Sequence, residues 1–72
     1  MSPEVCKKFL LVELGISQAQ CEAMARHAET FAAAIEDHSP RVADYLRKRA
    51  RFWKQMGNDT AALRDEVAKQ EA

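Results

Sequence analysis

The chain has 72 residues, of which 47% are hydrophobic and 31% charged, and its formal net charge is zero. This length allows one domain, and its core is marginal without a disulfide, a metal or a partner subunit. The balanced charge gives no general case for a nucleic-acid or membrane partner. No apolar run approaches about 18 residues and no signal-peptide pattern is present, so we expect a soluble, cytoplasmic protein.

The first predicted helix covers residues 3–14. Ser2 and Pro3 supply the capping hydroxyl and the proline typical of a first helical turn. Apolar side chains occupy most of its circumference, at Val5, Cys6, Phe9, Leu10, Val12 and Leu14. Gly15 predicts its end, because glycine commonly follows the last helical residue in a left-handed conformation. So short and apolar a helix must lie on the rest of the domain or on a partner.

A second helix is predicted over residues 17–38. Ser17 and Gln20 have the spacing of a capping box, and Ser39-Pro40 is a stop signal. The apolar stripe of this segment is rich in small residues: Cys21, Met24, Ala25, Ala28, Phe31, Ala32 and Ile35. We expect large side chains of the next segment to fill this small-residue stripe, namely Tyr45, Phe52 and Trp53.

The third segment, residues 40–70, carries the strongest pattern. Nine positions recur at alternating steps of four and three: Val42, Leu46, Arg49, Trp53, Met56, Thr60, Leu63, Val67 and Gln70. This is the 3.5-residue repeat of a helix that packs along another helix, as in a coiled coil. Gly57-Asn58-Asp59 could end the helix and start a fourth one. Because the repeat crosses these residues in phase, we favour one helix, with a break at 57–59 as the alternative.

These segments predict a single all-α domain over residues 1–72. The short connection at Ser39-Pro40 implies a long antiparallel hairpin of the second and third helices, with the N-terminal helix packed on it. That makes three helices, or four with a break at 57–59. The third helix is longer than the second, which leaves Met56, Leu63 and Val67 uncovered. Either the N-terminal helix or a second copy of the chain could cover them, and we expect a homodimer.

Residues suited to catalysis or metal binding are few. The two glycines do not form a phosphate-binding loop. His27 and His38 have no partner at metal-ligand spacing, and neither do Cys6 and Cys21. Both cysteines fall on apolar faces, where a free cysteine behaves as a small hydrophobe. The sequence predicts no enzyme activity, no catalytic residue, no metal and no cofactor.

A basic cluster in the third segment is the most distinctive local feature. Its members are Arg47, Lys48, Arg51 and Lys54, interleaved with aromatic residues. The cluster is either a solvated outer face or an electropositive surface for an acidic protein. We expect a small interaction module, such as a regulator, inhibitor or adaptor, that docks on a larger protein. Phe9 and Leu10 are further candidate contacts, and a coiled-coil assembly factor is a structural alternative.

The alternative of another class is a DNA-binding regulator. The apolar and turn positions have the spacing of a helix-turn-helix: Leu10, Leu14, Gly15, Ile16, Cys21 and Met24. This stretch resembles the helix-turn-helix of bacterial repressors, which implies DNA contacts by Gln18, Gln20 and Arg26. Leu11 is bulky where that pattern has a small residue. Residues 1–38 carry three Lys/Arg against six Asp/Glu, which opposes phosphate binding. Nucleic acid is therefore the second choice of partner.

Overall fold

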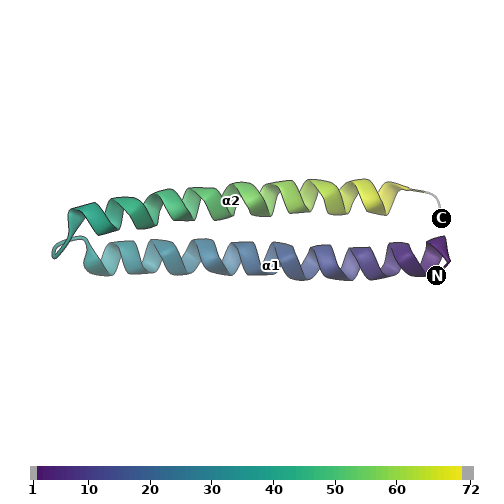
Figure 1. The fold of residues 1–72 in the computed structure, drawn as a ribbon, viewed down its shortest axis with the longest axis horizontal. Coiled ribbons are helices and arrows are strands. Elements are labelled where there is room, and N and C mark those ends of the chain that lie inside the picture. The colour runs from purple at the N-terminus through teal and green to yellow at the C-terminus, as the bar shows by residue number, and fades with distance from the viewer. Residues whose placement is uncertain (1, 71–72) are drawn as a thin grey trace.

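The computed structural model describes residues 2–70 and shows two long helices joined by a short turn (Figure 1). Helix α1 is Pro3–Ile35 and helix α2 is Pro40–Lys69. The helices run antiparallel, so the start of α1 and the end of α2 lie at the same end of a rod of 54 × 14 × 12 Å. The predicted all-α hairpin is confirmed, but it has two helices where three or four were expected.

Both helices begin at the Ser-Pro pairs that the sequence marks. The Ser2 hydroxyl accepts a hydrogen bond from the backbone N–H of Val5 at 3.2 Å, and Pro3 occupies the first helical turn. Ser39 accepts the equivalent bond from Val42 at 3.3 Å ahead of Pro40. Each serine satisfies one backbone N–H that has no partner inside its own helix.

The predicted end of a helix at Gly15 is wrong. Helix α1 continues through Gly15 with no positive φ angle, so Ser17 lies inside a helix and not at its start. A glycine within a helix costs only about 1 kcal/mol relative to alanine. On either side of Gly15, the half-buried Leu11, Leu14 and Gln18 continue the contact with α2. Packing along the whole hairpin therefore outweighs a local stop signal.

The residues buried between the two helices, which we call the seam, are small. They are Cys21, Ala25, Ala28 and Ala32 of α1, and Ala43, Ala50, Gly57 and Thr60 of α2. No large side chain is fully buried among the described residues. The Thr60 hydroxyl donates to the carbonyl of Met56 at 2.8 Å, which satisfies the buried polar group.

Small residues face small residues across the seam, so the expectation that large side chains fill it is wrong. A Cβ placed on Gly57 would lie 3.4 Å from the Cβ of Cys21, which shows how closely the two helices approach. Tyr45 and Phe52 stay 59% and 50% exposed, and Trp53 is half-buried. Backbones this close leave no room for aromatic rings between them, so the rings turn to the sides of the hairpin.

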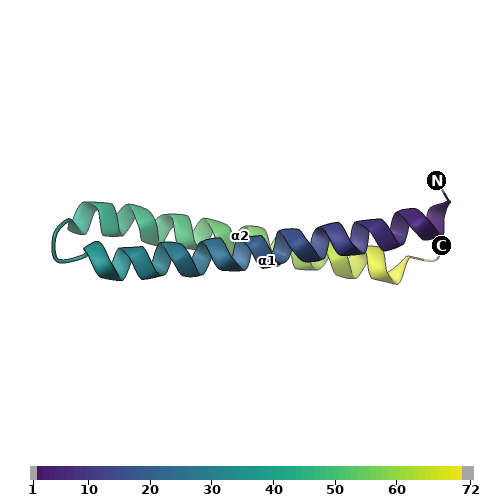
Figure 2. The ribbon, with the colours of Figure 1, turned by 90° about the horizontal axis from the view of Figure 1, so that it is seen from below.

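Helix α2 runs through Gly57 without a break. The helices cross near the middle of the rod instead of lying strictly parallel (Figure 2). The seam on α2 is centred on Ala43, Ala50 and Gly57, one position beyond the predicted row of Val42 and Met56. That row now flanks the seam, with Val42 46% and Met56 41% exposed.

Candidate interaction surfaces

The narrow seam divides the rest of the hairpin into a polar and an apolar side. On α1, acidic residues recur every seven positions on one side of the seam, at Glu22, Glu29 and Glu36. Large apolar residues occupy the other side at the same spacing, at Met24 and Phe31. Seven residues are almost two helical turns, so each row stays on its own side.

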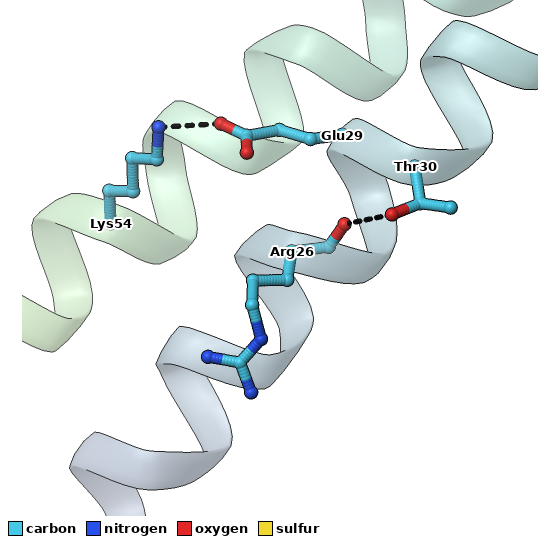
Figure 3. A network of polar contacts seen from close by, with 4 residues as sticks. All are labelled: Arg26, Glu29, Thr30 and Lys54. Atoms are coloured by element: carbon cyan, nitrogen blue, oxygen red, sulfur yellow. Dashed lines mark hydrogen bonds and ion pairs between the residues drawn. The ribbon is translucent and has the colours of Figure 1, made fainter.

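Two ion pairs join the helices on the polar side. Arg47 Nη2 lies 3.0 Å from Glu36 Oε2, and Lys54 Nζ lies 2.5 Å from Glu29 Oε1. Figure 3 shows Lys54 reaching across to Glu29, while the guanidinium of Arg26 points away from that pair. The four paired side chains are 41–59% exposed, so each pair contributes at most about 1 kcal/mol.

These pairs change the character of the predicted basic cluster. Arg47, Arg51 and Lys54 line one hollow together with Glu29, and Lys48 is exposed outside it. Two of the four members of the basic cluster, Arg47 and Lys54, thus already have carboxylate partners. The charge left for another protein is that of Lys48 and Arg51.

The apolar side forms a continuous open groove. One hollow, of about 580 Å³, is lined by Leu14, Ser17, Gln20, Cys21, Ala23, Met24, Trp53, Met56 and Thr60. A second, of about 220 Å³, is lined by Met24, His27, Ala28, Phe31, Tyr45, Leu46, Arg49 and Trp53. Met24 and Trp53 border both hollows, which joins them into one feature. We call it the apolar groove.

Arg49 brings a cation to the edge of the apolar groove. Its guanidinium carbon lies 5.5 Å from the centre of the Trp53 ring and 5.6 Å from that of Phe52. The two rings meet edge to face at 5.3 Å. Cation–π contact holds the Arg49 side chain over the rings, and no carboxylate among the described residues forms an ion pair with it.

A second apolar surface lies on the N-terminal half of α1. Val5, Phe9, Val12 and Ile16 are 50–61% exposed and follow one another at steps of four, three and four. This spacing places them on one line along the helix. The half-buried residues that face α2 in this stretch, such as Leu14, lie on the opposite side. We call this line the outer stripe.

The sequence predicted part of this surface. Phe9 belongs to the outer stripe. Leu10, 40% exposed, stands one and two seven-residue repeats before the groove-lining Ser17 and Met24, so it continues the groove side of α1. Val5, Val12 and Ile16 were not identified as contacts from the sequence, because the short first helix was expected to bury its apolar side chains against the hairpin. Their spacing of four, three and four was the signal that could have identified them.

The residues of the helix-turn-helix alternative do not come together. Residues 10–24 form one uninterrupted stretch of α1, so the turn of that motif does not occur. Gln18 and Arg26 line a hollow on the polar side, where Gln18 donates a hydrogen bond to Glu22 at 3.4 Å. Gln20 lines the apolar groove instead. The three side chains therefore do not form one DNA-contacting surface.

Features of other site classes are few in the described part of the chain. No group of three or more His, Cys, Asp or Glu residues within 2–70 is arranged to hold a metal ion. Neither α1 nor α2 contains a stretch apolar enough to cross a membrane. Cys6 is exposed, Cys21 is buried, and both are free thiols.

Comparisons with known proteins add no assignment to these surfaces. No protein-family model matches the chain, and no similar curated protein or solved structure was found.

Proposed function

We propose that this protein is a non-enzymatic protein-interaction module, a regulator, inhibitor or adaptor that docks on a larger protein. The observation that carries the proposal is the outer stripe. Its four large apolar side chains are at least half exposed on the side of α1 that α2 does not use. Exposed apolar patches of this kind mark interaction surfaces in soluble proteins.

The stripe suits docking into a groove or against a helix of the partner. Four anchors at i, i+4, i+7 and i+11 are the pattern of a helix that lays one face into an apolar groove. The eleven-residue span from Val5 to Ile16 is about 16 Å long at the helical rise. Such anchors bury their area without refolding, because α1 is held in place by α2 along its length.

Charges on the hairpin would orient the partner. Lys8 is exposed beside the outer stripe, and Lys48 and Arg51 are exposed nearer the turn of the hairpin. A partner with an acidic rim would gain favourable long-range attraction to the two basic residues on α2. The basic cluster thus contributes orientation and association rate, while the stripe contributes most of the affinity.

The proposal includes the cytoplasmic homodimer that the sequence predicts, with coiled-coil packing of the helices. A dimer of hairpins would present two outer stripes and bind a symmetrical or repeated partner more tightly than one copy can. The face used for self-association must then differ from the outer stripe.

The experiment is a quantitative pull-down with the tagged chain from native lysate, with and without nuclease, read by mass spectrometry. Val12→Glu puts a charge in the middle of the outer stripe, and Ala62→Glu puts the same charge on an exposed position of α2. We expect a stoichiometric protein that survives nuclease, is retained by Ala62→Glu and is lost with Val12→Glu. Recovery that vanishes with nuclease would overturn the proposal in favour of nucleic-acid binding. Equal recovery by both variants would exclude the outer stripe as the docking surface.

A further inference from the structure

The chain exposes more surface than a compact protein of its mass. Its accessible surface is 5551 Å² at a mass of 8.1 kDa. A compact monomer of that mass exposes about 4,500 Å², so the excess is about 1,000 Å². Each partner in a stable protein–protein interface buries about 800 Å². The surplus surface is therefore large enough for one interface of standard size.

The composition of the seam indicates why a second layer is needed. The buried side chains are alanine, glycine, cysteine and threonine, so little apolar area is removed from water inside the hairpin. The large apolar side chains bordering the seam remain open instead: Met24 is 42%, Phe31 60% and Met56 41% exposed. A pair of helices this thin is marginal by itself.

We propose that a second copy of this chain packs its apolar groove against the apolar groove of the first, forming a four-helix bundle. This inference rests on the proposed function, whose outer stripe lies on the back of α1 and stays free in such a bundle. The groove contains the large side chains that the seam lacks, and Trp53 and Met24 at its middle would become the core of the bundle. The polar side, with its two ion pairs, remains in water.

Charge placement indicates how the two copies are oriented. Arg49 lies at the end of the apolar groove near the turn. Gln20 and Tyr45 line the apolar groove. Glu13 lies one seven-residue repeat before Gln20, and Glu66 lies three such repeats after Tyr45. Both glutamates therefore continue the groove side of their helices toward the end of the rod away from the turn. Two copies with their turns together would place like charges opposite each other. With turns at opposite ends, the Arg49 end of each copy meets the acidic end of the other.

The placement of charges and apolar groups on this face also favours a second copy over an unrelated protein. A two-fold interface uses the same patch twice, so that patch must be complementary to itself. The apolar groove has open hollows beside protruding apolar side chains, and basic and acidic charges at its opposite ends. A patch with a single sign of charge would not have this property.

The test is sedimentation equilibrium of the full chain and two matched variants. We expect wild type at twice the 8.1 kDa chain mass. Met56→Glu, in the groove, should raise the dimer dissociation constant about a hundredfold or more, because each interface would then bury two unpaired carboxylates. Val12→Glu, the same kind of change on the outer stripe, should leave the dimer intact.

Two results would overturn the inference. One is a wild-type chain that sediments at 8.1 kDa even at high concentration. The other is a dimer that Val12→Glu dissociates and Met56→Glu does not. If the charged variants fail to fold, Met56→Ala and Val12→Ala provide the same comparison without added charge, with about tenfold or greater weakening expected only for Met56→Ala. Loss of partner capture with Val12→Glu at unchanged dimer mass keeps the proposed function and the dimer separable.

Discussion

Replacing Gly15 by alanine tests directly whether α1 is one helix. Alanine is favoured over glycine by about 1 kcal/mol within a helix. A Cβ on Gly15 would lie 3.6 Å from the Cζ atom of Arg64, an ordinary contact with a flexible side chain. We therefore expect Gly15→Ala to stabilise the protein by about 0.5–1 kcal/mol. For a chain of this size, that raises the melting temperature by roughly 3–7 °C.

The assay is thermal and urea unfolding followed by circular dichroism at a fixed protein concentration. Ser17→Ala is the matched second variant, because a serine inside a helix can become alanine at no cost, whereas a helix-capping serine loses about 1 kcal/mol. Destabilisation by both substitutions would refute the reasoning. It would mean that Gly15 has a left-handed conformation and that a new helix starts at Ser17.

Three further outcomes follow from the seam and the surfaces. Gly57→Leu should destabilise the protein in urea unfolding by about 1–3 kcal/mol through overpacking against Cys21, and Gly57→Ala should be tolerated. Lys54→Ala should cost less than about 1 kcal/mol, and added salt should reduce that cost, because its pair with Glu29 is exposed. In a Cys21→Ala background, spin labels can be attached to Cys6 alone. If the turns lie at opposite ends of the dimer, the Cys6 labels lie toward opposite ends too, and the helical rise gives a separation of about 40 Å. A separation below about 20 Å would contradict this orientation.

The parts of the fold that could be predicted from the sequence are those with strong local causes. Ser2-Pro3 and Ser39-Pro40 start helices because a hydroxyl cap and a proline ring act within one turn. The antiparallel direction follows from the short connection between the helices. Gly15 misled the prediction because its preference for a helix end is worth only about 1 kcal/mol, less than the packing of a continuous helix on α2.

The orientation of the helices about their own axes could not be obtained from periodicity alone. A seven-residue repeat fits both the row of Met56 and the neighbouring row of Gly57, and the prediction chose the larger side chains. In the structure the row of small residues is buried, because small side chains let the two helix backbones approach closely. The larger side chains, among them Trp53, then line the apolar groove.

The candidate surfaces were predictable in part. Phe9 and Leu10 were identified from their apolar character, and both are exposed. The pairing of Arg47 with Glu36 follows from the antiparallel register, which no single segment contains. The outer stripe appears only when α1 is known to be one helix with α2 on its opposite side. Its role in docking remains the prediction that the pull-down tests.

The most direct test of the account is the concentration dependence of thermal unfolding. If the hairpin depends on a second copy for its stability, the melting temperature must rise with protein concentration, because dissociation of the dimer accompanies unfolding. For a dimer of this size, a hundredfold increase in concentration should raise it by roughly 10 °C. A melting temperature that stays constant across that range would contradict the account, since it would show that a single hairpin is stable by itself.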